Sequence, residues 1–275
     1  YNFFEVSMES DRRERRALAL DLREAIRNRE LTVHYQPLAE VETGSFQGFE
    51  ALARWDSPTH GPVSPGVFIP IAEENGAILD LSEMVLQTVC REAARWDTPF
   101  TVAVNISPIQ FEKSDLVALV DATLGSSGLD PARLELEITE SVLIHDADYA
   151  VETLNRLKRL GVRVALDDFG TGYSSLSYLQ RFPFDKIKID RSFVSELGES
   201  QQSAAIVRGV IGLARGLGVP VIAEGVEKPE HLDALRQAGC HEMQGFLVGR
   251  PAPIETFAEL VYPHARPLAV EPVTR

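Results

Sequence analysis

The chain has little cysteine and no long hydrophobic run. Its cysteines, Cys90 and Cys240, form no CxxC pair and are too few for a disulfide framework, so we expect both to be buried thiols in a reducing compartment. No apolar segment approaches the roughly 20 residues that cross a bilayer, and the N-terminus has no signal-peptide pattern. We therefore expect a cytoplasmic segment without membrane contact of its own, and leave open whether a parent protein is tethered to a membrane.

Positive charge is also scarce. The 275 residues include 27 Lys and Arg against 41 Asp and Glu, which gives a formal net charge of −14. This balance opposes the binding of DNA, because the surface would repel an extended chain of phosphates. A small anionic ligand would therefore need metal ions or a local basic group.

Several common catalytic motifs are missing. No histidine pair has the HExxH spacing of a zinc protease, and no serine lies in a nucleophile-elbow context. No glycine-rich nucleotide loop follows the first predicted strand. The first two absences argue against a zinc protease and a serine hydrolase. The third gives no support to an open doubly wound sheet, which is kept as the alternative architecture.

What the sequence does contain is an alternation of strand-like and helix-like segments. The predicted strands are 31–36, 47–55, 101–106, 134–138, 163–168, 186–190, 219–224 and 243–248, and the helices between them include 79–96, 116–124, 149–160, 203–217 and 229–238. Several of these helices end just before a glycine, namely Gly161, Gly218 or Gly239. Successive βα units favour a parallel sheet, so we predict an α/β fold, a (β/α)8 TIM-like barrel.

The first part of the chain stands apart from this alternation. Residues 1–8 form a strand-like piece and 9–16 a charged run, after which apolar residues follow helical spacing from Ala17. We therefore predict an N-terminal linker helix before the barrel. The barrel would occupy 17–262, and 263–275 would form a C-terminal tail.

Carboxylate, amide and ammonium side chains recur at the ends of the predicted strands. They are Glu50, Asn105, Glu137, Asp167, Asp168, Lys188, Glu224 and Gln244. Since the carboxyl ends of parallel strands meet at one rim of a barrel, we expect these residues to lie together. A rim of oxygen ligands suits hard cations, which indicates a metal-dependent hydrolase.

The two-residue period of a strand groups some of these side chains. Glu50, Leu52 and Arg54 share one face, which places an acid and a phosphate-pairing guanidinium in one pocket. The alternative is that Arg54 forms a salt bridge with a neighbouring acid. Lys188 shares a face with Asp190, and it either orients a water among the acids or only balances their charge.

The acidic pair Asp167 and Asp168 imposes a condition on its strand. Adjacent residues of an ideal strand point to opposite faces, so both reach one site only if the strand ends or bulges there. The alternative is that the pair caps a turn. On the preceding strand, Glu137 lies nearer the end and has a better claim to metal ligation than Glu135, whose role is structural by this argument.

The motifs that contain these residues closely resemble those of the EAL-domain cyclic-di-GMP phosphodiesterases. They are YQP at 35–37, EALARW at 50–55, NIS at 105–107, EITES at 137–141, DDFGTGYSSL at 167–176, KIKID at 186–190, AEGVE at 223–227 and QGFLVGRP at 244–251. Each motif is short, but their order and spacing from about Leu22 to Pro251 are specific. The opening YNFFEVSM is similar to the end of a GGDEF domain, so the resemblance implies an upstream GGDEF-like domain in the parent chain.

The resemblance implies a barrel that binds two Mg²⁺ or Mn²⁺ ions and hydrolyses cyclic di-GMP to linear pGpG, with Ca²⁺ as an inhibitor. It assigns one metal to Glu50, Asn105, Glu137 and Asp167, and the other to Asp167, Asp168 and Glu224. The catalytic residues would be Lys188, which orients a water, with Glu50, Gln244 and Glu227. The substrate contacts would be Leu52, Arg54, Gln36 and Asp190. Glu140 would anchor the DDFGTGYSS loop, which in relatives connects the metal site to the interface of a homodimer.

Every acid of the family pattern is present, and this favours an active phosphodiesterase. A noncatalytic cyclic-di-GMP receptor is the alternative, and a barrel that only binds proteins is a third hypothesis, although it would need no acidic rim. Glu227 also has the alternative role of capping the following helix.

Overall fold

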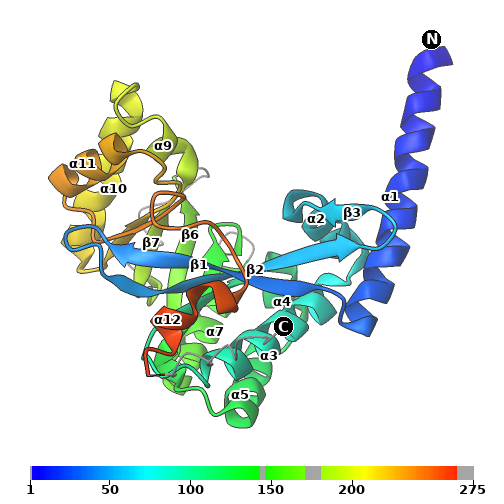
Figure 1. Ribbon diagram of the computed structural model, residues 1–275, viewed down its shortest axis with the longest axis horizontal. Helices are drawn as coiled ribbons and strands as arrows, with labels where there is room; N and C mark the ends of the chain where they lie inside the picture. The colour runs from blue at the N-terminus through cyan, green and yellow to red at the C-terminus, as the bar shows by residue number, and fades with distance from the viewer. Residues whose placement is uncertain (1, 143–145, 171–180, 265–275) are drawn as a thin grey trace, which may run out of the picture.

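The structure is a computed structural model of the 275-residue chain (Figure 1). It describes residues 2–142, 146–170 and 181–264, and for 2–14 the backbone only. Within these residues, no helix combines the length and the apolar character that crossing a membrane requires. Cys90 and Cys240 are both buried free thiols, as predicted.

Eight strands close into a barrel, in the order β1-β9-β8-β7-β6-β5-β4-β2, and the ring is completed where β1 pairs with β2. The strands are β1 Thr32–Glu40, β2 Phe46–Ser57, β4 Thr101–Ile106, β5 Leu134–Thr139, β6 Arg163–Phe169, β7 Lys186–Ile189, β8 Val221–Ala223 and β9 Glu242–Gln244. A short strand, β3 (Gly61–Val63), forms a hairpin with the end of β2. The predicted barrel is therefore confirmed, and the open doubly wound sheet is excluded.

The expectation that all strands run parallel is wrong for β1. This strand is antiparallel to both of its neighbours, β2 and β9, whereas the other neighbouring pairs of the barrel are parallel. Only residues 41–45 separate β1 from β2. A parallel crossover needs about a dozen residues or more. A connection as short as 41–45 can therefore only form a hairpin.

The last strand is shorter than predicted. β9 ends at Gln244 instead of continuing to residue 248, because the chain turns at Gly245, where φ is +157°. A Cβ at Gly245 would lie 2.2 Å from the carbonyl oxygen of Val226, so the chain passes too close to the preceding loop for any larger residue. Residues 245–248 therefore belong to a turn at the mouth of the barrel.

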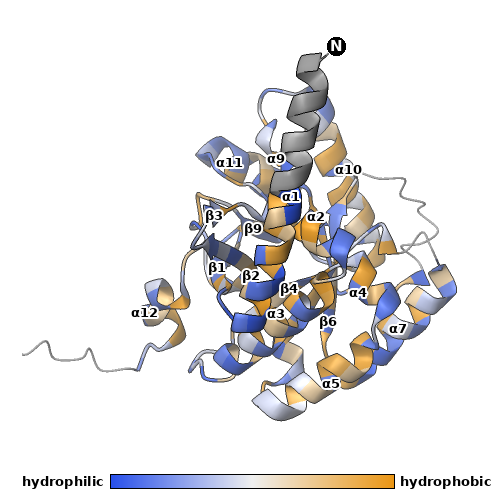
Figure 2. Ribbon diagram, turned by 90° about the vertical axis from the view of Figure 1, so that its right-hand side faces the viewer, coloured by the Kyte–Doolittle hydropathy of each residue, from blue (hydrophilic) through white to orange (hydrophobic). Residues whose placement is uncertain are grey.

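Helices surround the barrel, and their apolar positions alternate with polar ones along α5 and α7 (Figure 2). They are α1 Asn2–Asn28, α2 Pro65–Asn75, α3 Ile78–Ala93, α4 Pro108–Lys113, α5 Leu116–Ser127, α7 Ala147–Leu160, α9 Arg191–Ser195, α10 Gln201–Leu217, α11 Pro229–Ala238 and α12 Ala258–Val261, with 3-10 turns at Pro131–Arg133 and Ile254–Phe257. The five helices predicted within the barrel correspond to α3, α5, α7, α10 and α11. Four of them end at glycines in the left-handed conformation: α5 at Gly128, and α7, α10 and α11 at the predicted Gly161, Gly218 and Gly239.

The N-terminal helix is longer than predicted. α1 begins at Asn2, so the strand predicted over residues 1–8 is wrong, and α1 projects beyond the barrel (Figure 1). A helix satisfies its backbone hydrogen bonds internally, whereas a strand needs a partner strand. The predicted linker helix itself is confirmed, and its apolar side chains Leu22, Ala25 and Ile26 are buried in the core with those of α2 and α3.

Candidate active site

A buried lysine lies at the centre of the strand-end residues. Lys188, on β7, is 1% exposed. Its Nζ lies 2.6 Å from Glu224 Oε1, 2.7 Å from Glu137 Oε2, 3.3 Å from Asp167 Oδ1 and 3.9 Å from Glu50 Oε1. These acids come from β2, β5, β6 and the loop after β8, so residues far apart in sequence converge on one ammonium group, as the sequence predicts.

Three side-chain amides complete this rim and orient Glu50. Asn105 Nδ2 donates to Glu50 Oε1 at 2.7 Å, and Gln244 Nε2 donates to Glu50 Oε2. The same Gln244 nitrogen lies 3.0 Å from Gln36 Oε1, and Gln36 Nε2 donates to the carbonyl oxygen of Gly249 at 3.1 Å. Both carboxylate oxygens of Glu50 are therefore fixed by hydrogen bonds, one from each side of β2.

Asp167 and Asp168 both reach the rim because their strand is irregular. The pairing of β6 with β7 shifts between Leu166 and Phe169, and Asp168 has a φ of +54°, which is unusual for a residue other than glycine. One carboxylate oxygen each from Asp167, Asp168 and Glu224 lies within 4.8 Å of the others. The irregularity that the sequence requires for both aspartates to share a site is thus present.

The carboxylates of this cluster outnumber its lysine, and their pKa values reflect the crowding. Burial raises the pKa of Glu224 to about 8, the charges of Asp167 and Glu50 add to the shift, and Lys188 opposes it. Burial likewise raises the pKa of Glu137 well above its usual range, against the attraction of Lys188. Burial alone would lower the pKa of Lys188, but the surrounding acids raise it well above the usual value. The cluster therefore carries an excess of acids that a bound cation would offset.

Asp168 and Glu50, two further acids of the rim, are shifted in opposite directions. Partial burial and the charge of Asp167 raise the pKa of Asp168 to about 6. For Glu50, burial acts to raise the pKa, but Lys188 and the hydrogen bond from Gln244 outweigh burial and lower it. Glu50 therefore keeps its negative charge more readily than Glu137, Asp168 and Glu224, whose pKa values are raised.

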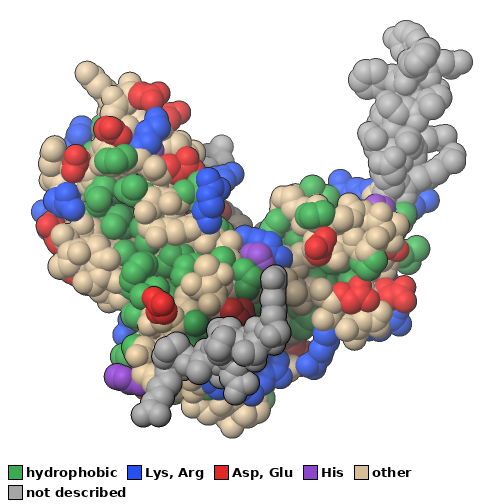
Figure 3. Space-filling model, in the orientation of Figure 1, with side chains coloured by type: hydrophobic (Ala, Val, Ile, Leu, Met, Phe, Trp, Pro, Cys, Tyr) green, Lys and Arg blue, Asp and Glu red, His purple; other side chains and the backbone are tan. Residues whose placement is uncertain are grey.

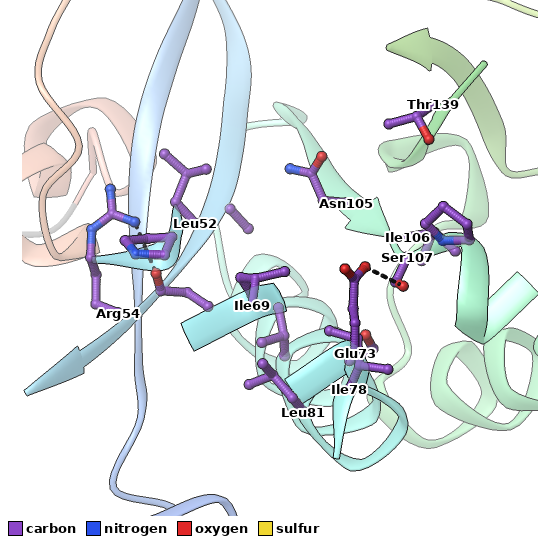
Figure 4. Close-up of a pocket in the computed structure, with 16 residues that line it drawn as sticks. Leu52, Arg54, Ile69, Glu73, Ile78, Leu81, Asn105, Ile106, Ser107 and Thr139 are labelled. Carbon is purple, nitrogen blue, oxygen red and sulfur yellow. Dashed lines mark hydrogen bonds between the residues drawn. The ribbon is translucent and has the colours of Figure 1, made fainter. Parts of the chain in front are cut away.

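A cavity of about 320 Å³ opens beside this rim (Figure 4). Leu52, Arg54 and Asn105 line one side, and apolar residues of α2 and α3, such as Ile69 and Leu81, line the other. The guanidinium of Arg54 donates to the carbonyl oxygen of Ala53 at 2.9 Å. Among the described residues, no carboxylate lies within ion-pair distance of Arg54, so the salt bridge considered as its alternative role is absent there.

Basic side chains gather in a hollow of the surface, although the overall charge is negative. Figure 3 shows a hollow between the part of the molecule that carries α9, α10 and α11 and the part that carries α1 and α2, with Lys, Arg and His side chains at its base. This local positive charge meets the requirement, set by a net charge of −14, for a basic group near an anionic ligand.

Two residues that line or border the cavity were missed by the sequence reasoning. Glu73, near the end of α2, accepts a hydrogen bond of 2.7 Å from Ser107 Oγ, just after β4 (Figure 4). Ser107 had two signals, its place in the NIS motif at 105–107 and its position before Pro108, because a serine followed by proline often begins a helix. No signal in the sequence pointed to Glu73.

The structure does not bring Glu227 into the cluster. Its side chain is exposed on the loop after β8, and its backbone N–H donates to His231 Nδ1 at 3.5 Å. It is not the cap of the next helix either, because α11 begins after Lys228 and has no side-chain cap. Glu224, three residues earlier, is the acid of this loop that reaches Lys188.

Asp190 and Glu140 lie at the edge of the rim. Asp190 begins α9 and accepts a hydrogen bond of 3.1 Å from the backbone N–H of Ser192, while its charge also raises the pKa of Asp168. Glu140 Oε1 accepts a hydrogen bond of 3.0 Å from the backbone N–H of Gly170. Gly170 is the last described residue of the DDFGTGYSSL motif before 171–180, so the rest of the motif lies outside the described residues.

Comparison with known proteins agrees with this geometry. The family model of the EAL domain matches residues 19–251. The chain belongs to the EAL domain family. The match falls within the predicted barrel range of 17–262, and those outer boundaries stay predictions. The barrel and the strand-end acids are thus found in an EAL domain.

Relatives of this EAL domain include named phosphodiesterases. The chain is 54% identical over 255 residues to an uncharacterized signaling protein of Caulobacter vibrioides, and the match covers 93% of the chain and 32% of that protein. It is 43% identical over 259 residues to MucR of Pseudomonas aeruginosa, a bifunctional diguanylate cyclase/cyclic di-GMP phosphodiesterase, covering 93% of the chain and 38% of MucR. The chain thus spans about a third of the length of these relatives.

A solved structure of the MucR phosphodiesterase in complex with c-di-GMP has the same fold. It matches this EAL domain with a TM-score of 0.85 at 43% identity, and the match covers 88% of this chain and 99% of that chain. The likeness therefore extends over almost the whole of a domain that binds c-di-GMP.

Proposed function

We propose that this EAL domain hydrolyses one phosphodiester of cyclic di-GMP to give linear 5′-pGpG, and that it needs two Mg²⁺ or Mn²⁺ ions. The observation that carries the proposal is the convergence of acids from four parts of the barrel beside a cavity lined by Arg54. The likeness to MucR supports the choice of substrate.

The donor set of the rim fits hard divalent cations. One metal would be held by Glu50, Asn105, Glu137 and Asp167, and the other by Asp167, Asp168 and Glu224. Carboxylate and amide oxygens are the ligands such cations prefer. Burial and the charges of Asp167 and Glu50 raise the pKa of Glu224, and a bound cation would oppose both effects. When bound, the metals would lower the pKa of a water and stabilise negative charge on the phosphoryl oxygens.

The residues of the chain would orient the reaction. Lys188 stays protonated among the acids, and its ammonium group would hold the attacking water in line with the phosphorus. Glu50 would stay ionised and fixed, because Asn105 and Gln244 donate to its two oxygens. We also propose a catalytic role for Glu227, which would act through the loop that it shares with Glu224, because its own side chain is exposed and lies outside the cluster.

The substrate would lie across the cavity and the rim. Arg54 would pair with a phosphate, because no described acid competes for its guanidinium and arginine binds phosphate oxygens in pairs. Leu52 and the apolar wall would pack against a nucleobase, as apolar pockets commonly do. Gln36 and Asp190, at the edges of the rim, would complete the contacts, and Glu140 would hold the start of the DDFGTGYSS loop.

The direct test is to incubate the purified domain with cyclic di-GMP and Mn²⁺, with and without chelator, and to separate the products by chromatography. We expect pGpG to form only in the absence of chelator. We expect less of it when Ca²⁺ replaces Mn²⁺, because the looser coordination of Ca²⁺ misplaces the reacting groups. Binding of the nucleotide without cleavage would instead support the second candidate, a noncatalytic cyclic-di-GMP receptor.

The setting of the domain is part of the same proposal. We propose that the domain forms a cytoplasmic homodimer and that a GGDEF-like domain precedes it in the parent chain. The name of MucR, which includes a diguanylate cyclase, supports the second of these proposals. Sedimentation of the purified chain at increasing concentration tests the dimer. A single monomeric species up to high micromolar concentration would contradict it.

A further inference from the structure

The end of α2 touches the strand that carries Asn105. Glu73 Oε1 accepts a hydrogen bond of 2.7 Å from Ser107 Oγ (Figure 4). Ser107 also caps α4, since its Oγ accepts from the backbone N–H of Ile109 at 3.2 Å. The hydroxyl therefore ties α2 to the point where the chain leaves β4, two residues beyond Asn105.

Asn105 lies two residues before this point on β4. Its side chain is exposed at the rim, and Glu50 is its one described hydrogen-bond partner, at 2.7 Å. Ile106, between Asn105 and Ser107, is 3% exposed and packs in the core. Because the backbone is fixed on one side by β4 and on the other by Ser107, the Glu73 contact limits how far Asn105 can turn away from the acids.

The same end of α2 is held by α1. Glu74 pairs with Arg15 at 2.6 Å, and the carbonyl oxygen of Asn75 accepts a hydrogen bond of 2.5 Å from Arg23. Below these polar contacts, Leu22 of α1 is fully buried. Both polar contacts are made by the two residues that directly follow Glu73, so the position of α1 on α2 and the position of Glu73 are set together.

We propose that Glu73 is a positioning residue for Asn105, and that the seating of α1 on the end of α2 acts on the metal site through the Glu73–Ser107 hydrogen bond. The proposal rests on the proposed role of Asn105 as a metal ligand. Groups that orient metal ligands commonly change metal affinity by about 10- to 100-fold when they are removed. α1 would then adjust the affinity of the rim for a divalent cation without touching it.

The test measures Mn²⁺ binding to the whole 275-residue protein without nucleotide, by the electron paramagnetic resonance signal of the free ion. We expect Glu73→Ala to raise the dissociation constant about 10-fold. Glu73→Gln should keep it within about 3-fold, because an amide oxygen still accepts the hydrogen bond from Ser107. Glu83→Ala is the matched control for the loss of a carboxylate, since Glu83 is exposed on α3 and Gln87 is its one side-chain partner among the described residues.

A double-mutant cycle then tests the route from α1. Arg23→Ala should raise the dissociation constant about 3-fold when Glu73 is present and should have no effect in the Glu73→Ala background, because coupled residues are non-additive. Thermal unfolding followed by circular dichroism checks that each variant is folded before its affinity is compared.

Each contrary result has a distinct meaning. Unchanged Mn²⁺ affinity in folded Glu73→Ala would reduce Glu73 to a packing residue and overturn the proposal. Equal effects of Arg23→Ala in both backgrounds would overturn the route through Glu73. Failure of the unaltered protein to bind Mn²⁺ at all would refute the proposed metal site, and this inference with it.

Discussion

Lys186 and Lys188 lie two residues apart on β7 and enter the barrel at two successive levels. Lys188 meets the acids of the rim, whereas Lys186 Nζ lies 3.0 Å from Glu135 and 2.8 Å from Glu242. Side chains two apart on a strand share a face, so the barrel contains a second ionic layer below the rim. Glu135 belongs to this lower layer, in agreement with the structural role assigned to it from its place in the strand.

The lower layer should matter for stability. Lys186→Ala would leave Glu135, which is 2% exposed, without its counter-charge, and breaking a buried ion pair costs about 3–5 kcal/mol. Urea unfolding measures this change. The control is Arg181→Ala, which removes an exposed pair with Asp148 and should cost at most about 1 kcal/mol. Similar losses in the two variants would mean that the lower layer contributes no more than a surface pair.

Replacing Lys188 should separate catalysis from metal binding. We expect Lys188→Ala to lower kcat by about 100-fold or more, because the group that orients the attacking water is lost. Affinity for Mn²⁺ should not weaken, since the substitution removes a positive charge from a site that takes a cation. Turnover and the Mn²⁺ dissociation constant would be measured on the same preparation. Equal losses in both would mean that the lysine acts mainly in holding the structure together.

Glu50→Ala should abolish turnover while the barrel stays folded. The substitution removes a proposed metal ligand that Asn105 and Gln244 hold in place, but it leaves the strand pairing of β2 unchanged. Release of pGpG and the circular dichroism spectrum would be compared with those of the unaltered protein. Unimpaired cleavage by this variant would contradict the assignment of Glu50 to the metal site.

The metal-free protein should lose stability as the pH rises. Asp168 and Glu224 have folded-state pKa values of about 6 and about 8, above the ordinary values of 3.8 and 4.5. The folded state therefore holds these protons more tightly than the unfolded chain, and the stability they contribute is lost as the pH passes through the folded pKa values.

We accordingly expect the Tm of the chelated protein to fall between pH 6 and pH 8, and saturating Mg²⁺ to reduce that fall, because the cation replaces the protons. Differential scanning calorimetry at fixed ionic strength would measure both curves. A Tm that rises with pH in the chelated protein would show that the crowded carboxylates do not hold protons in the folded state.

Much of the site could be predicted because strand ends in a barrel meet at one rim. Lys188 and Glu224 could be paired from that rule alone, and the need for both Asp167 and Asp168 to reach the rim predicted an irregularity in β6. The direction in which each strand runs was harder to predict, because a run of β-branched residues gives the position of a strand and not its orientation. For β1, the short connection 41–45 was the evidence, and it outweighs the pattern of the later strands.

Glu73 escaped prediction for a different reason. α2 has Pro70 in its interior and little separation of polar from apolar residues, so the usual signs of a helix are weak there. The exposure of Glu227 was also not predictable, and its role in catalysis stays a prediction. It lies only three residues from Glu224, but the turn after β8 directs it to the solvent, and no periodic pattern extends across such a turn.

The pairing of β1 with β9 has a consequence for synthesis of the chain. Gln36 and Gln244, which bond each other across that pairing, are separated by 208 positions. While a ribosome is still translating the middle of the domain, the first strand has emerged but its final neighbour does not yet exist. A nascent chain that lacks β9 therefore cannot close its ring. Any truncation before Gln244 should leave a protein with neither a closed barrel nor a complete rim of site residues.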